Sequence, residues 1–222
     1  MKTEPDRLEP LAAAVAKAAP DFDERQQRIA LEVYRRLAEG GPAPASDIAE
    51  RAGVAVDRVQ QLLATWPGVY LDEDGSVTGF RGLTINKLSP RHRIEVEGLE
   101  LFAWCAWDTL FLPGILGATA RVQSACPTTS ETISLTVSPE EIVETSHPVA
   151  VMSFLVPDRN FDADVIKSFC DFVHFFASRE AGEAWTAEHP GTFLLSLGEA
   201  FELGHLVNAL NFPSALGGHN EG

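Results

Sequence analysis

Apolar residues recur at helical spacing through the first part of the chain. Leu8, Leu11 and Val15 fall on one face of a helix, which Pro20 would end. A second apolar stripe over residues 29–37 predicts another helix, which stops before a glycine pair. Because the first helix has a single apolar face, we expect it to dock against the rest of the protein.

The following segments have the order of a helix-turn-helix motif with a hairpin behind it. Ser46 is placed to cap a short helix over residues 47–52, and Gly53 is placed to end it. A third helix is predicted over residues 55–65, and a hairpin with an acidic, glycine-containing turn over residues 69–80. Together these elements predict a winged-helix-like module.

The pattern becomes mixed in the rest of the chain. Runs rich in Val, Ile and Thr predict strands over residues 118–122, 132–137 and 149–156. Helix signals occur over residues 138–141, 164–177 and 196–211, the last with a capping box from Ser196 and Glu199. Short strands between helices, without βαβ regularity, predict an α+β fold with a small, mainly antiparallel sheet. We expect two domains, 1–85 with the N-terminal helix and winged-helix-like module, and 86–222 with the α+β fold.

Charge limits the partners that this chain can bind. Its 222 residues carry 17 Lys and Arg against 32 Asp and Glu, a net charge of −15. Residues 25–93 hold ten basic and eight acidic side chains, a balance of 10 − 8 = +2, and the third helix sets one cation, Arg58, beside one anion, Asp57. A nucleic-acid partner needs a segregated basic surface, so we predict none, although a winged-helix regulator remains an alternative. The module would instead serve as a structural lid or a dimer surface.

A long apolar stretch raises the question of a membrane span. Over residues 101–120 only Asp108 is charged, and this is about the length of a span. Pro113 and two glycines interrupt it, and a carboxylate in mid-span is costly, so a buried core segment is favoured and no membrane is predicted. Three cysteines are too few for a disulfide scaffold, and the first twenty residues carry charges that a secretory signal lacks. A cytoplasmic location is therefore expected.

The chemistry-bearing residues are cysteines and one aspartate, because phosphate-binding, zincin, nucleophile-elbow and CxxC motifs are missing. Cys105 and Asp108 lie in an apolar run over residues 101–112, and on a helix their spacing of three would place them on one face. Burial raises a carboxyl pKa, which suits a general acid or proton shuttle. Two alternatives remain open, with Cys105 as a small core residue and Asp108 as a helix cap.

A second cysteine, Cys170, lies four residues before a histidine, His174. Cys170 and His174 would share a face of the helix predicted over residues 164–177. With Cys105 and Cys126 they could form a Cys₃His zinc site, but the scattered cysteines lack the close spacing of structural zinc sites. His174, between Val and Phe, is typical of a hydrogen-bonded core histidine. Two thiolates and a carboxylate suit a soft ion such as Hg(II) or Cu(I) better.

Four segments resemble one known family in the same order. They are residues 102–110 (FAWCAWDTL), 118–126 (ATARVQSAC), 134–139 (SLTVSP) and 168–178 (SFCDFVHFFAS). They are similar to segments of the organomercurial lyases, also called alkylmercury lyases. The resemblance implies that Cys105, Asp108 and Cys170 are the catalytic residues and also the ligands of mercury, and that Cys126 is structural. Where some relatives have a second cysteine after the match to Cys170, this chain has Asp171.

The resemblance also implies an activity. These lyases cleave the carbon–mercury bond by protonolysis, which yields a hydrocarbon and Hg(II) and serves mercury detoxification and resistance. One cysteine would capture the organomercurial and Asp108 would pass a proton from the second thiol to carbon, within apolar walls from Trp104, Trp107, Phe111 and Phe172.

The family pattern further implies no required cofactor, with Hg(II) bound as product and removed by thiols or by a partner such as mercuric reductase. A non-catalytic soft-metal binder or metallochaperone that uses the same cysteines is the alternative.

Overall fold

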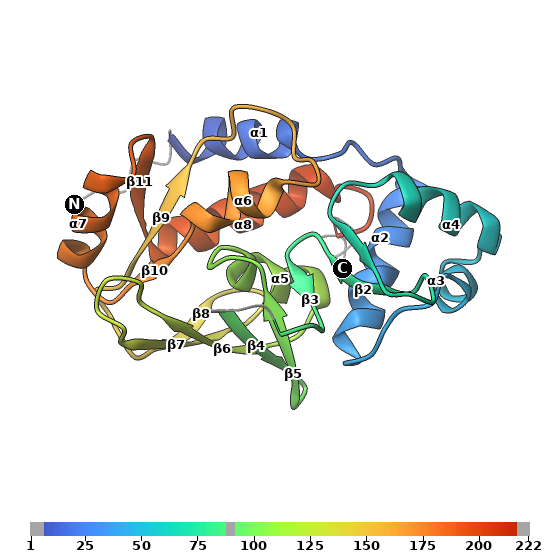
Figure 1. Ribbon diagram of the computed structural model, residues 1–222, viewed down its shortest axis with the longest axis horizontal. Coiled ribbons are helices and arrows are strands. Elements are labelled where there is room, and N and C mark those ends of the chain that lie inside the picture. The colour runs from blue at the N-terminus through green and yellow to red at the C-terminus, as the bar shows by residue number, and fades with distance from the viewer. Residues whose placement is uncertain (1–6, 88–91, 217–222) are drawn as a thin grey trace, which may run out of the picture.

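The computed structural model describes residues 7–87 and 92–216. Four helices form the N-terminal part: α1 Leu8–Ala18, α2 Glu24–Ala38, α3 Ala45–Ala52 and α4 Val56–Thr65. The last three gather at one end of the molecule (Figure 1). Gly53 ends α3 in the left-handed conformation, as predicted. The predicted Ser46 cap is wrong, because α3 begins at Ala45, two residues earlier than predicted, and has no side-chain cap.

The hairpin behind these helices is part of a larger sheet. Eight strands pair antiparallel in the order β1-β2-β3-β5-β4-β6-β7-β8. They are β1 Val69–Leu71, β2 Val77–Phe80, β3 Leu83–Thr84, β4 His92–Val96, β5 Leu99–Ala103, β6 Ala120–Ala125, β7 Thr132–Val137 and β8 Ile142–Thr145. The predicted α+β class is confirmed. Since β3 pairs with both β2 and β5, one sheet runs through both predicted domains, and the division at residue 85 stays a prediction.

The remaining elements lie around a three-stranded antiparallel sheet of order β10-β9-β11. Its strands are β9 Val151–Leu155, β10 Phe175–Phe176 and β11 Thr192–Ser196, and the helices are α5 Asp108–Leu116, α6 Val165–Ser168, α7 Arg179–Glu188 and α8 Leu197–Asn211. The predicted capping box of Ser196 and Glu199 starts α8. Figure 1 shows α8 between α1 and α5, and it contacts both. The first helix therefore docks as expected.

Two predicted helices are wrong. Over residues 164–177 only α6 is α-helical; a 3-10 turn, Cys170–Phe172, follows, and then β10. The break falls at Phe169 (φ −136°), and the aromatic run after it pairs with β9 instead. Residues 138–141 form a turn, because the Ser138 hydroxyl accepts the backbone N–H groups of Glu140 and Glu141. Strands β3, β4, β5, β8, β10 and β11 and helix α7 were not predicted.

The apolar stretch over residues 101–120 is divided between the end of β5, helix α5 and the first residue of β6. No single element spans the stretch. Among the described residues, no helix combines the length and the apolar character needed to cross a membrane.

Candidate functional site

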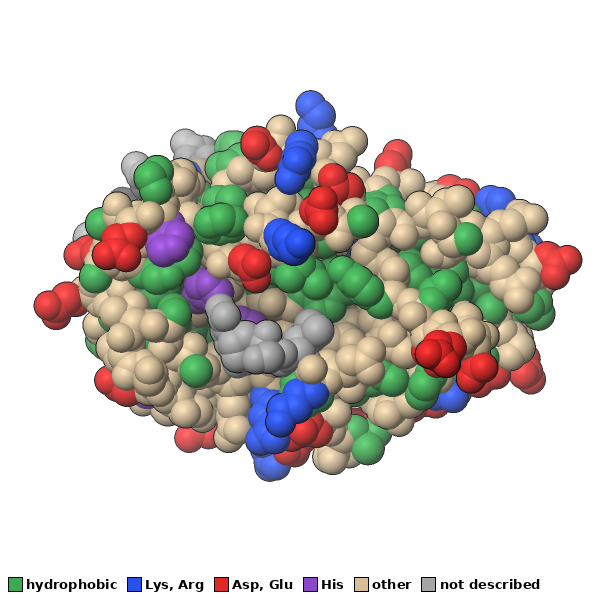
Figure 2. All heavy atoms as spheres, viewed as in Figure 1, with side chains coloured by type: hydrophobic (Ala, Val, Ile, Leu, Met, Phe, Trp, Pro, Cys, Tyr) green, Lys and Arg blue, Asp and Glu red, His purple; other side chains and the backbone are tan. Residues whose placement is uncertain are grey.

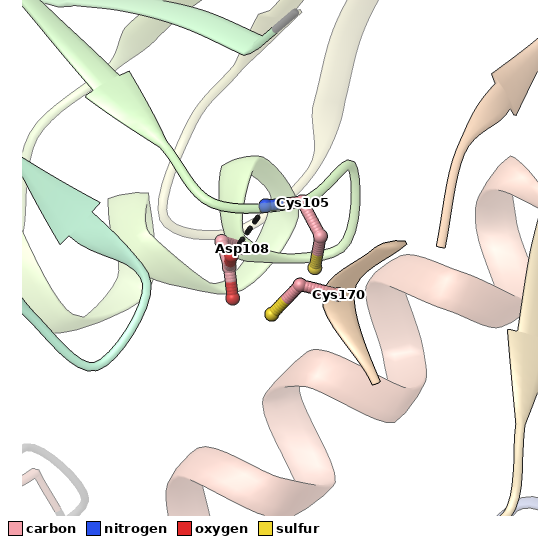
Figure 3. A group of neighbouring side chains, drawn as sticks. All are labelled: Cys105, Asp108 and Cys170. Atoms are coloured by element: carbon pink, nitrogen blue, oxygen red, sulfur yellow. Dashed lines mark hydrogen bonds between the residues drawn. The ribbon is translucent and has the colours of Figure 1, made fainter. Parts of the chain in front are cut away.

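The structure brings Cys105, Asp108 and Cys170 together, and we call them the thiol–carboxyl cluster (Figure 3). The two sulfur atoms and a carboxylate oxygen all lie within 4.8 Å of one another. All three residues are buried, with exposed fractions of 0%, 5% and 4%. Soft sulfur ligands beside one carboxylate, out of water, form a donor set that favours a thiophilic metal.

A tight turn between β5 and α5 positions the first two members of the cluster. Asp108 is the first residue of α5, so it does not cap a helix that starts at Thr109. Its Oδ2 accepts the backbone N–H of Cys105 at 2.7 Å, which closes the turn. The expected helical spacing is therefore wrong, yet the turn achieves the same proximity. The Ala106 N–H donates to the Val173 carbonyl at 3.2 Å and ties this turn to the segment of Cys170.

Cys170 opens the 3-10 turn that replaces the predicted helix. The buried Ser153 of β9 fixes the end of that turn, because its hydroxyl donates to the Phe172 carbonyl at 2.8 Å and accepts the His174 N–H at 3.0 Å. On the other side, Phe169 packs edge-on against Phe154. The position of Cys170 thus depends on the three-stranded sheet and not on helical register.

Gly82, just before β3, touches the carboxyl group of Asp108. A Cβ atom at Gly82 would lie 2.7 Å from Asp108 Oδ1, and the residue has φ +101°. Both the contact and the backbone require glycine. Sequence analysis did not select Gly82 for this role. Its only local signal is that a glycine follows the predicted hairpin. A residue of the first predicted domain therefore holds the carboxyl group of the second.

Burial sets the protonation of the cluster. Desolvation raises the pKa of Asp108 to about 6, although hydrogen bonds from Cys105 and Trp104 oppose the shift. Desolvation also raises the pKa of Cys105 well above its usual value. At Cys170 a hydrogen bond from the Cys105 thiol lowers the pKa, but burial and the carboxylates of Asp108 and Asp171 raise it by more. Asp108 can thus gain or lose a proton near neutral pH.

Asp108 and Cys170 of the cluster line a mainly apolar pocket with about 700 Å³ of empty space, part of it open to solvent. Both predicted domains line it: Tyr34, Gly68, Arg81 and Gly82 come from the first, and Trp104, Trp107, Phe111, Asp108 and Cys170 from the second. Phe172, predicted as a wall, is not among the lining residues. The winged-helix part therefore helps to build the pocket, and the sequence did not indicate Tyr34, Arg81 or Gly82.

Cys126 and His174 lie apart from the cluster. Within the described ranges, neither belongs to the group of close metal-ligating side chains, so the Cys₃His set does not form. Cys126 is buried in the turn after β6, where its N–H donates to the Glu131 carbonyl. The His174 ring lies near the Asp171 carbonyl and edge-on to Trp185, the packed environment predicted for it.

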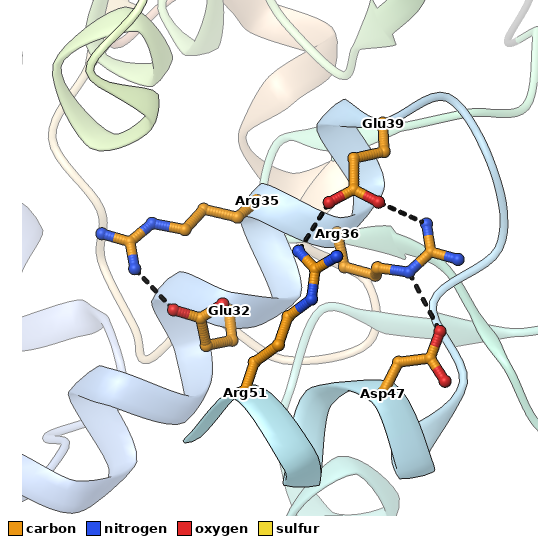
Figure 4. A network of polar contacts seen from close by, with 6 residues as sticks. All are labelled: Glu32, Arg35, Arg36, Glu39, Asp47 and Arg51. Carbon is orange, nitrogen blue, oxygen red and sulfur yellow. Dashed lines mark hydrogen bonds and ion pairs between the residues drawn. The ribbon is translucent and has the colours of Figure 1, made fainter. Parts of the chain in front are cut away.

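The helices of the winged-helix part pair most of their cations with carboxylates. Arg36 contacts Asp47 at 3.2 Å and Glu39 at 3.1 Å, and Figure 4 shows the wider network of Glu32, Arg35, Arg36, Glu39, Asp47 and Arg51. On the face drawn in Figure 2, acidic and basic side chains are interspersed. This arrangement leaves little free positive charge for a nucleic acid, in line with the sequence-based expectation, which stays a prediction.

Two close thiols and a carboxyl group with a pKa near neutrality define a class of site, one that can bind a soft metal centre and exchange a proton beside it. Comparison with known proteins gives the family. Residues 87–208 match the family described as alkylmercury lyase, and residues 7–81 match the helix-turn-helix domain of alkylmercury lyase.

Similar proteins agree with these matches. Alkylmercury lyase of Staphylococcus epidermidis is 43% identical over 80% of this chain and 80% of its own length. Those of Bacillus cereus and Pseudomonas putida are 41% and 40% identical over 79% of this chain, covering 78% and 80% of their own lengths. The crystal structure of the mercury-bound form of MerB2 shares the fold, with a TM-score of 0.69, 23% identity, and coverage of 91% of this chain and 98% of that one. The chain belongs to the alkylmercury lyase family, as its sequence indicated.

Proposed function

We propose that Cys105, Asp108 and Cys170 cleave the carbon–mercury bond of organomercurials by protonolysis. The observation that carries the proposal is the cluster itself: two sulfur atoms and a carboxylate oxygen lie within 4.8 Å of one another, and Asp108 and Cys170 line an apolar pocket. The thiols supply the soft ligands that mercury prefers, and the carboxyl group supplies the proton that carbon needs.

Capture of the substrate comes first. A thiolate displaces the ligand that mercury carries and forms a sulfur–mercury bond, while the carbon–mercury bond stays intact. The Cys105 thiol donates a hydrogen bond to the Cys170 sulfur, which favours ionisation of Cys170 relative to Cys105. This supports Cys170 as the first thiolate and Cys105 as the second.

Proton transfer then breaks the bond to carbon. The Asp108 carboxylate takes the proton of the second thiol, and that sulfur binds mercury. Two thiolates push electron density onto mercury, so that the carbon becomes easier to protonate. Protonated Asp108 gives its proton to the carbon, which leaves as hydrocarbon with the electron pair of the broken bond. Hg(II) stays between the sulfurs of Cys105 and Cys170, and mercury is neither oxidised nor reduced.

The pocket walls support these steps. Trp104, Trp107 and Phe111 line the space beside the cluster and suit an alkyl or aryl group. Their packing keeps competing water away from the reacting carbon. No organic cofactor takes part in the proposal. Hg(II) leaves to small thiols or to a partner such as mercuric reductase in a reducing cytoplasm, and Asp171 supplies no further thiol for that step.

The test is release of arene from an arylmercurial by reduced protein. Wild type should release benzene from phenylmercury, whereas Cys105→Ala and Cys170→Ala should release none above background. Cys126→Ser is the matched control, because it removes a buried thiol outside the cluster and should keep turnover. Mercury bound without any arene would favour a metallochaperone instead, and turnover by Cys170→Ala would overturn the assigned roles.

A further inference from the structure

Arg81 places a cation in the apolar pocket of the cluster, and among the described residues it has no anionic partner. Its side chain lines this pocket together with Asp108 and Cys170. The Nη1 atom is enclosed and, within residues 7–87 and 92–216, has no hydrogen-bond partner. The guanidinium carbon lies 5.2 Å from the centre of the Phe22 ring, a cation–π contact that leaves Nη1 unsatisfied.

The fold holds this residue in an unfavourable position. Arg81 has φ +37°, in the left-handed region that side chains other than glycine rarely adopt. Two hydrogen bonds fix its backbone: its N–H donates to the Gly68 carbonyl at 2.9 Å, and the Tyr34 hydroxyl donates to its carbonyl at 3.0 Å. Strain and an unpaired buried donor at the same residue are typical of a functional position.

Arg81 does not serve as the counter-ion of Asp108. No ion pair joins the Arg81 and Asp108 side chains among the residues that the structure describes. Asp162 lines the same pocket, but it is exposed, and no ion pair links it to Arg81 among the described residues. The guanidinium is thus available to a group that enters the pocket from outside.

We propose that Arg81 binds a carboxylate carried into the pocket with mercury and so determines specificity for anionic substrates. A guanidinium matches the two oxygens of a carboxylate, and an enclosed donor gains most from such a partner. The net charge of −15 repels anions, so a local cation is needed to admit them. The inference rests on the proposed function. The carboxylate can belong to the organic group or to the thiol ligand that carries mercury, and the two sources can be tested apart.

The first experiment is a competition between two arylmercurials in one tube, both as 2-mercaptoethanol adducts. Phenylmercury is neutral, and 4-mercuribenzoate has the same ring with a carboxylate. The ratio of benzoate to benzene released gives relative specificity independently of the amount of active protein. Arg81→Gln should lower this ratio at least about tenfold, since it removes a charged hydrogen bond. Arg81→Lys should recover part of it. Arg58→Gln, which removes an exposed cation from α4, should leave it unchanged.

A second experiment tests whether the carboxylate belongs to the thiol ligand that carries mercury. Phenylmercury is supplied as its 3-mercaptopropionate adduct and, separately, as its 2-mercaptoethanol adduct, and the rates are compared in wild type and Arg81→Gln. If Arg81→Gln loses only the preference for 4-mercuribenzoate, the carboxylate belongs to the organic group. If it loses only the rate advantage of the 3-mercaptopropionate adduct, the carboxylate belongs to the thiol ligand. The proposal is overturned if Arg81→Gln changes neither the ratio of benzoate to benzene in the first experiment nor the ratio of the two rates in the second.

A binding measurement separates this proposal from the lyase reaction. The masses of trapped protein–mercurial adducts show which arylmercurial is captured, even where no arene is released. Absence of arene release in wild type would count against the proposed function, while a capture preference for 4-mercuribenzoate that Arg81→Gln removes would still support the carboxylate site. Equal capture of both mercurials by wild type and Arg81→Gln would refute that site.

Discussion

Replacing Asp108 by Asn tests the proton transfer while it leaves the shape of the site almost unchanged. The amide oxygen can still accept the Cys105 N–H that Oδ2 accepts at 2.7 Å, so the turn before α5 should persist. The amide group cannot take a proton from a thiol and pass it to carbon. Capture of mercury by Cys105 and Cys170 should therefore survive in Asp108→Asn, and release of hydrocarbon should not.

The expected loss of rate is that of a missing general acid, about 10²–10⁴, or about 3–5 kcal/mol of barrier.

The same variant should be more stable than wild type at neutral pH. Burial raises the pKa of Asp108 from 3.8 to about 6, so the folded state favours the protonated form. Stability from this group is complete below its unfolded pKa and is lost as pH rises through about 6. The rise in the Asp108 pKa corresponds to a gain on the order of 2–3 kcal/mol for Asp108→Asn at pH 8, which falls to about 0.5 kcal/mol near pH 4.

Two measurements on one sample separate these effects. Titration of the remaining thiols after addition of phenylmercury reports capture, and gas chromatography of the headspace reports benzene. Denaturant melts at pH 8 and pH 4 report stability. Asp162→Asn is the control, because Asp162 lines the same pocket but is exposed and outside the cluster. Benzene release at the wild-type rate by Asp108→Asn would refute the reasoning, and loss of capture as well would assign Asp108 to forming the site.

Three further results are expected. Gly82→Ala should lower arene release and stability, because its Cβ would lie 2.7 Å from a carboxylate oxygen of the cluster; Gly75→Ala, with a similar positive φ and no atom within 4 Å, is the control in activity assays. Equal rates for both variants would exclude a positioning role for Gly82. Arene release by wild type should fall as pH is lowered through about 6, since a protonated carboxyl group cannot accept the thiol proton, and a flat profile from pH 5 to 8 would contradict this. Cys126→Ser should lower the free energy of unfolding by about 1–3 kcal/mol in thermal or denaturant melts, and an unchanged stability would show that its burial contributes little.

Local sequence patterns predicted the elements that depend on local physics. The helices α1, α2 and α4, the hairpin and α8 with its capping box follow from apolar periodicity, glycine and caps. Cys105 and Asp108 could be selected because three residues separate them within an apolar run, and a tight turn satisfies that spacing as well as a helix does. Cys170 was a candidate ligand through its spacing to His174 on a predicted helix that does not form, and the family segments assigned it a catalytic role.

The remaining parts depend on contacts between distant segments. Residues 173–176 have both helix and strand signals, and pairing of β10 with β9 decides between them. Gly82 and Arg81 reach the pocket because β3 pairs with β5, a partnership that no local pattern indicates. Ala106 and Val173 bring the two cysteines together through a backbone hydrogen bond. Sequence alone could therefore select the reactive groups but could not place the winged-helix part in the pocket.

The most direct measurement is the hydrocarbon formed from phenylmercury in heavy water. Reduced wild-type protein should release one monodeuterated benzene for each mercury bound, because the proton on Asp108 exchanges with solvent before it reaches carbon. Two thiols, those of Cys105 and Cys170, should become untitratable at the same time. Mercury held by the protein with both thiols consumed and no benzene above the protein-free background would contradict protonolysis at this cluster.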